Sequence, residues 1–199
     1  MTAIYKMTDG NMQTRGGFQW ALHEPRTAPG GGPLYTEAWL HAYTDPLVGA
    51  FLAPVYSSFE RPRLFRGEGE IGATDHGLIV GCTRAVLHEE LPVPVVTNSQ
   101  RVRFAILCAW EVCEDPTWRA WAEKWLAGED RSMKAAEAAA AWAAGAEAEA
   151  WAAWAAAWAA VRAAANAAWE VAEAVARTAR SAPLDLPALA RRAVEEETH

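Results

Sequence analysis

The feature that most constrains the fold is a proline-free segment, residues 131–180, in which about half of the residues are alanine. Alanine has the highest helix propensity of all residues, and the glycine at Gly145 costs only about 1 kcal/mol within a helix. At about 100° per residue, the charged side chains fall on one arc of such a helix and the apolar side chains on the opposite arc, with Glu147 as the exception. We therefore expect one continuous helix about 75 Å long, at about 1.5 Å per residue.

Tryptophan recurs in this segment at a spacing that also occurs in the helix expected before it. The pattern W-x-x-W-x-x-x-W is formed twice, by Trp118, Trp121 and Trp125 and by Trp151, Trp154 and Trp158. Steps of three and four residues place each trio on one helix face, and Val161 and Trp169 extend the second face. Each Trp buries on the order of 200 Å², so both faces must be covered by another surface.

The surface that covers the second trio has two alternatives, the interior of the same chain or another copy of it. The helix expected near 116–127 is about 18 Å long, so it folds back only over residues 131–143. The last helix reaches only residues 168–180. The middle of the long helix must therefore pack on the helix near 103–114, on the first half of the chain, or on a second molecule.

The first hundred residues have a different pattern, with short apolar stretches separated by turns rich in Gly and Pro. This pattern is typical of β-structure. The expected strands are 4–7, 18–23, 34–41, 63–71 and 78–88. A short helix is expected near 45–53, because Asp45 suits an N-cap and Pro46 the first helical position.

The sequence thus predicts an α+β protein with two parts. A β-rich N-terminal domain spans residues 1–100, and an antiparallel helical region containing one very long Ala- and Trp-rich helix spans residues 101–199. The expected helices lie near 103–114, 116–127, 131–180 and 186–197. Pro116 marks a helix start, Gly128 a helix end, and Asp185 the cap of the last helix.

The overall charge and the cysteines narrow the classes of partner. A net charge of −7 argues against nucleic-acid binding, which requires clustered Lys and Arg, and against binding to anionic membranes. Cys82, Cys108 and Cys113 form no CxxC pair, so we expect free thiols without a metal or another cofactor. The N-terminus lacks the pattern of a secretory signal, which favours the cytoplasm. The excess of Arg over Lys is typical of a GC-rich, thermophilic source.

Catalytic motifs are not evident in the sequence. The run Gly30–Gly32 has no lysine and no G-x-G-x-x-G spacing, so we interpret it as a hairpin loop and not as a phosphate cradle. The candidate catalytic residues are His41, Tyr43 and Glu90, and they could act together only if the fold brought them into one cleft. Isolated His and Glu residues of this kind are more often surface or strand residues.

Three segments resemble, in order, parts of a domain of unknown function found in phage and bacterial proteins. They are "YKMTDGNMQTRGGFQW", "WLHAYTDPLVGAFL" and "IVGCTRAVLHEEL". The Gly-Phe-His of that family is replaced here by Trp39-Leu40-His41, and its cysteines are absent. The resemblance covers about the first half of the chain, and it implies a phage-encoded accessory protein, in the host cytoplasm or the virion, without established catalytic residues.

The segment "RAVLHEELP" is loosely similar to the acidic last strand of ADP-ribosyltransferase folds, but the Ser-Thr-Ser strand of that family is missing. Three functions follow as hypotheses. The first is a non-enzymatic interaction protein that self-associates or docks on another protein through the Trp face. The second is a small-molecule-binding or anti-defence protein with a pocket for a nucleotide or dinucleotide in the β-rich half. The third is a degenerate or active transferase.

Overall fold

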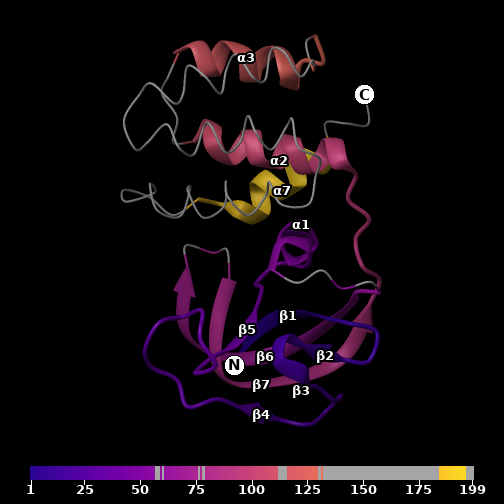
Figure 1. Ribbon diagram of the computed structural model, residues 1–199, viewed down its shortest axis with the longest axis vertical. Coiled ribbons are helices and arrows are strands. Elements are labelled where there is room, and N and C mark those ends of the chain that lie inside the picture. Colours follow the sequence, from indigo (N-terminus) through magenta and orange to yellow (C-terminus); the bar gives the residue numbers. More distant parts are fainter. Residues whose placement is uncertain are drawn as a thin grey trace. The chain divides into compact units, whose positions relative to one another are not determined.

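The computed structural model describes residues 1–56, 59, 61–75, 77, 79–111, 116–129, 131 and 184–195. The chain divides into two compact units, Met1–Val95 and Val96–His199 (Figure 1). Of the helix expected for 131–180, only Arg131 is described, and it is not helical; residues 132–180, with the second Trp trio, Val161 and Trp169, lie outside the described residues, as does Cys113.

The first unit is built on a long antiparallel hairpin, which is joined on both sides by shorter strands (Figure 1). The hairpin strands are β6 (Arg63–Asp75) and β7 (Ile79–Leu91). Strand β1 (Thr2–Thr8) pairs with the first half of β6, while β4 (Arg26–Thr27) and β5 (Leu40–Ala42) pair with β7; all of these pairings are antiparallel.

A reciprocal pair of backbone hydrogen bonds joins the two outer parts of this sheet. The N–H of Tyr5 donates to the C=O of Tyr43, and the N–H of Tyr43 donates to the C=O of Tyr5, both at 2.8 Å. Because Tyr5 belongs to β1 and Tyr43 directly follows β5, the strands β1, β6, β7 and β5 form a closed ring. Closure satisfies backbone groups that an open edge would leave exposed.

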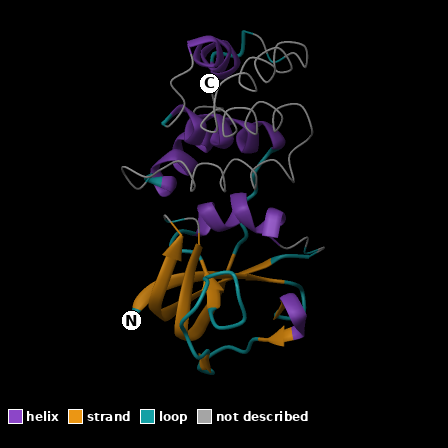
Figure 2. Cartoon of the chain, turned by 60° about the vertical axis from the view of Figure 1, so that its left-hand side comes forward, coloured by secondary structure: helices purple, strands orange, loops and turns teal. Residues whose placement is uncertain are grey.

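Short elements complete the first unit. The strands β2 (Gln13–Thr14) and β3 (Phe18–Gln19) pair around the 3-10 turn η1 (Arg15–Gly17). Helix α1 (Pro46–Tyr56) contacts β1 (Figure 2). The expected cap of α1 is confirmed, because Asp45 Oδ1 accepts the N–H groups of Leu47 and Val48 at 2.8 and 3.1 Å.

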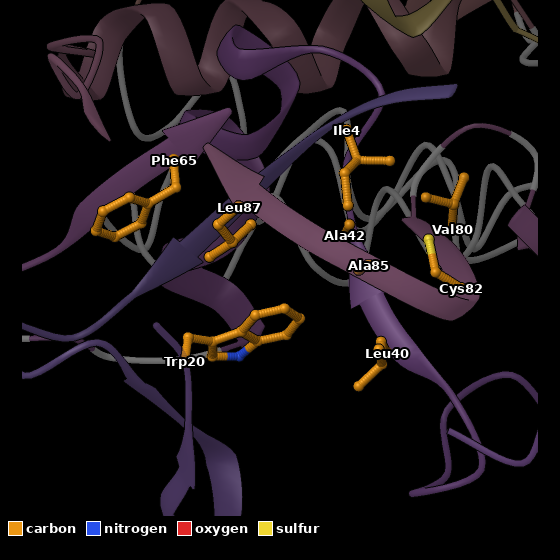
Figure 3. Close-up of a cluster of buried hydrophobic side chains, with 9 residues drawn as sticks. All are labelled: Ile4, Trp20, Leu40, Ala42, Phe65, Val80, Cys82, Ala85 and Leu87. Carbon is orange, nitrogen blue, oxygen red and sulfur yellow. The ribbon is translucent and has the colours of Figure 1, made fainter. Parts of the chain in front are cut away.

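Apolar side chains from all four strands of the ring meet in its core (Figure 3). The cluster consists of Ile4, Trp20, Leu40, Ala42, Phe65, Val80, Cys82, Ala85 and Leu87. Two glycines of β6 allow the strands and side chains to come this close. A Cβ on Gly67 would lie 2.1 Å from the carbonyl oxygen of Val86, and one on Gly69 would lie 2.7 Å from Cys82 Sγ. Neither site has room for any other residue.

The described helices of the second unit are α2 (Asn98–Trp110), α3 (Pro116–Leu126) and α7 (Leu186–Glu195) (Figure 1). Helix α2 begins five residues before the expected start at 103 and ends four residues before 114. The cause is a capping box at its first turn: Thr97 Oγ1 accepts the N–H of Gln100 at 3.1 Å, and the Thr97 N–H donates to Gln100 Oε1 at 2.9 Å.

The expected end of α3 and the expected start of α7 are confirmed at the residues that the sequence indicated. Gly128 has φ +77, its N–H donates to the C=O of Trp125, and the Glu129 N–H donates to the C=O of Lys124. This is the Schellman arrangement that terminates a helix. Asp185 Oδ1 accepts the N–H of Ala188 at 3.0 Å at the start of α7.

The α+β prediction, with a β-rich part followed by helices, is confirmed for the described residues. Two predicted strands are much shorter than expected, because 18–23 contains only the two residues of β3 and 34–41 only the start of β5. In the first of these segments, the His23 N–H donates to the C=O of Leu87 on β7; in the second, the C=O of Ala38 accepts the N–H of Gly30 in the preceding loop. None of the described helices combines the length and the apolar character that crossing a bilayer requires.

Candidate functional site

The three candidate residues from the sequence do not meet in one cleft. His41 lies opposite Gly81 in the pairing of β5 with β7, whereas Glu90 lies opposite Phe65, nearer the other end of β7. Nine residues of strand separate these positions, up to about 30 Å at about 3.3 Å per residue. Tyr43 lies two residues after His41, where its backbone pairs with that of Tyr5 on β1. Any shared chemistry of His41 and Tyr43 therefore excludes Glu90.

His41 belongs to a small polar cluster at the end of the hairpin. Its ring stacks on that of Tyr35 with centroids 6.3 Å apart and 13° between the planes, and Tyr35 Oη donates to the carboxylate of Asp75. The Nε2 atom lies 2.5 Å from the C=O of Leu34. Burial is the main cause that lowers the pKa of His41, and the positive charge of Lys6 adds to it.

Lys6 is a charged residue in the interior of the strand ring. Its ammonium donates to the C=O of His41 at 2.5 Å and lies 5.3 Å from the centroid of the Trp20 ring. Burial lowers the pKa of Lys6 to about 8, and the nearby Cys82 partly opposes this. Burial also raises the pKa of the Cys82 thiol to about 11, so this thiol is protonated and unreactive at neutral pH. Lys6 therefore links β1 to β5 through its hydrogen bond to the backbone of His41.

A cavity of about 590 Å³ lies near Glu90, between the turn after β1 and the segment that leads into β6. Its size is within the range of small-molecule sites. The lining residues are Asp9, Gly10, Asn11, Phe59, Arg61, Pro62 and Arg63. Glu90 itself is not one of them, but it holds one of the two lining arginines.

The polar groups of this cavity differ in how far they are already engaged. Arg63 makes a bidentate pair with Glu90 at 2.8 and 2.6 Å, and this pair lowers the pKa of the Glu90 carboxyl. Its remaining nitrogen donates to the C=O of Gly10 at 3.4 Å. Asp9 Oδ1 accepts the N–H groups of Asn11 and Gln13 at 2.8 and 2.7 Å. Arg61 is exposed and has no hydrogen bond or ion pair within the part of the chain that the structure describes.

The first Trp trio is buried in the helical unit. Trp118, Trp121 and Trp125 on α3 are 0, 7 and 5% exposed. The ring of Trp118 lies 6.1 Å from that of Trp121 and 6.2 Å from that of Trp110 on α2. A W-x-x-W-x-x-x-W face is thus buried, with at most 7% of any of its Trp residues exposed, where the structure describes it. The indole N–H of Trp121 has no acceptor there.

Two arginines lie over the rings of Trp110 and Trp125. The guanidinium of Arg119 is 5.1 Å from the centroid of the Trp110 ring, and that of Arg131 is 4.7 Å from the centroid of Trp125. Each contributes about 0.5–1 kcal/mol at an exposed position. The Cys108 thiol on α2, two residues before Trp110, is also buried. Burial strongly raises the pKa of this thiol.

Among the described residues, no group of three His, Cys, Asp or Glu side chains could hold a metal ion. Comparisons with models of protein families, with curated proteins and with solved structures each gave no match. Sequence reasoning did not select Lys6, Tyr35 or Arg61. Lys6 shares a face of β1 with Ile4, but the apolar alternation Ala3, Tyr5 and Met7 in "AIYKMT" would place it on the outer face, so the sequence gives no signal for its burial. The other two lie in loops whose positions depend on the fold.

Proposed function

We propose that the protein is a non-enzymatic interaction protein that self-associates through the second Trp trio, Trp151, Trp154 and Trp158. The supporting observation is the complete burial of the first trio, which has the same spacing. A face with the same spacing, on a segment that the sequence predicts to be helical, has the same need for cover, because exposed apolar patches of this size are uncommon on soluble proteins.

The amount of surface fits a dimer. Six Trp side chains, three from each copy, would bury on the order of 1,200 Å², which is the lower limit for a stable interface. The alanines between them would let two helices approach closely, so that each Trp inserts between small side chains of the partner. Val161 and Trp169 would extend the interface along the same face.

Sedimentation or light scattering at micromolar concentration tests the proposal directly. The wild-type chain is expected to have at least twice the mass of 21.6 kDa given by its sequence. Replacing Trp151, Trp154 and Trp158 by Ala is expected to give a monomer that keeps its helical circular dichroism. A wild-type monomer would contradict self-association, as would an oligomer that survives the triple substitution.

A matched control changes the opposite face of the same segment. Glu149→Ala and Glu170→Ala remove charged residues from that opposite face, so the mass is expected to stay that of the wild type. If the triple Trp variant instead unfolds as a monomer while the wild type is also monomeric, the second trio belongs to the interior of the chain. That outcome separates the two surfaces that could cover it.

A further inference from the structure

We infer that the cavity between the β1–β2 turn and the start of β6 binds a small aromatic carboxylate, with the carboxylate on Arg61 and the ring against Phe59. This site lies entirely in the first unit, so the inference is independent of self-association through the helical unit.

The charged side chains of the lining determine which anion fits the cavity. Arg63 is neutralised by Glu90 through two short hydrogen bonds, which leaves the guanidinium of Arg61 as the lining cation without a partner among the described residues. A guanidinium matches a carboxylate through two parallel N–H to oxygen bonds. Asp9 also lines the cavity, and its negative charge offsets that of Arg61. A ligand with one negative charge therefore fits better than one with two.

The apolar part of the ligand is selected by Phe59 and Pro62, which are the apolar side chains of the lining. An aromatic ring offset against Phe59 gains more than its buried area alone provides. On the other side, the turn is held rigidly, because Asp9 Oδ1 fixes the N–H groups of Asn11 and Gln13 and Arg63 holds the C=O of Gly10. A rigid wall reduces the entropy lost when a ligand binds.

Titrations of the full chain followed by amide NMR test this assignment with four probes. Benzoate carries both features, benzamide only the ring, acetate only the charge, and phenyl phosphate a ring with a second charge. We expect benzoate to shift the amide resonances of Gly10 and Asn11, with a dissociation constant on the order of 1 mM. Benzamide, acetate and phenyl phosphate should each bind at least several-fold more weakly.

Substitutions identify the contacts. Arg61→Gln is expected to weaken benzoate binding about ten- to a hundredfold, and Arg61→Lys less, because Lys keeps the charge but loses the planar fork. Phe59→Leu should remove the preference for benzoate over acetate. The matched control is Arg66→Gln, which removes an exposed arginine that pairs with Glu89 on the same sheet, outside the cavity; its benzoate affinity should equal that of the wild type.

Several outcomes would overturn the inference. Wild-type Gly10 and Asn11 resonances that do not move in excess benzoate would exclude the site. Equal binding of benzamide, or unchanged binding in Arg61→Gln, would remove Arg61 from it. Tighter binding of phenyl phosphate than of benzoate would mean that the site prefers a phosphate to a carboxylate. Because Arg61 is exposed, Arg61→Gln should keep the wild-type spectrum elsewhere, which separates lost binding from lost folding.

Discussion

The two units of the chain both combine very large side chains with very small ones, but they use different small residues. In the first unit, Trp39 lies against strand glycines, so that a Cβ on Gly72 or Gly81 would come within 2.7 and 3.0 Å of its ring atoms. In the second unit, Trp118 is buried among helices whose buried residues include Ala105, Ala109, Ala122, Ala190 and Ala193.

The backbone explains this difference. A glycine inside a helix costs about 1 kcal/mol relative to alanine, so a helix obtains its small residues as alanine. In the closed strand ring, the same position is approached by backbone or ring atoms at distances where no Cβ fits. The comparison teaches that small residues accompany buried aromatic rings in both units, as Gly72 and Gly81 beside Trp39 in the first and as buried alanines in the described helices of the second.

The largest expected effect on stability comes from removing the indole ring of Trp118. Trp118 is fully buried, so Trp118→Ala should lower the free energy of unfolding of the helical unit by about 3–5 kcal/mol. Urea unfolding followed by fluorine NMR of fluorotryptophan measures this, with Trp125 reporting on the helical unit and Trp20 on the first. An equal loss at both reporters would show that the units unfold together and would break the comparison.

The corresponding test in the first unit is the smallest possible enlargement of a glycine. Gly67→Ala places a Cβ 2.1 Å from the backbone oxygen of Val86, which cannot move without breaking the strand pairing. We expect a loss of about 2–3 kcal/mol at the Trp20 reporter. Gly10→Ala is the matched control, because its nearest atom would be 3.6 Å away, and it should change stability by less than about 0.5 kcal/mol.

The two units should also respond differently to alkaline pH. Lys6 has a folded-state pKa of about 8, below its ordinary 10.5, so the unfolded chain binds more protons between these values and stability rises with pH. Cys82 has a folded-state pKa of about 11, above its ordinary 9.0, so stability falls as pH rises above 9. The first unit should therefore gain about 1 kcal/mol from pH 8 to 9 and then level off.

The helical unit contains Cys108 with a raised pKa, so its stability should only fall above pH 9. Unfolding curves collected at pH 7, 8, 9 and 10 with the same two reporters distinguish these profiles. Lys6→Met should abolish the rise in the first unit and leave the helical unit unchanged. A rise that persists in Lys6→Met would assign it to another group.

The smallest effects are expected at the helix caps, one in each unit. Asp45→Ala frees two N–H groups of α1, and Thr97→Ala removes the capping box of α2. Each should cost about 1 kcal/mol, seen at the Trp20 and Trp125 reporters respectively. Asp45→Asn and Thr97→Ser keep a capping oxygen and should restore most of the stability. A cap substitution that lowers stability at the reporter of the other unit would mean that the two units unfold together.

Local features of the sequence were sufficient for the helix ends. Asp45, Gly128 and Asp185 act where the sequence placed them, because a cap involves residues only two to five positions apart. The early start of α2 was missed although its T-x-x-Q capping box is equally local. The two long strands of the hairpin were also predicted, at 63–71 and 78–88, because short apolar stretches there are bounded by turn residues, and the structure extends them to Asp75 and Leu91.

Only the tertiary structure decided which residues share a site. The ring closes where Tyr5 meets Tyr43, and Lys6 reaches the backbone of His41, across 35 or more residues of sequence. The spacing of His41, Tyr43 and Glu90 contains nothing about the pairing register of β7, which places Glu90 beside Arg63 and far from His41. By itself, the sequence determined that a β-rich part is followed by helices and where Asp45, Gly128 and Asp185 cap them. Strand pairing, which depends on distant partners, determined the strand ring, the buried lysine and the cavity with Arg61.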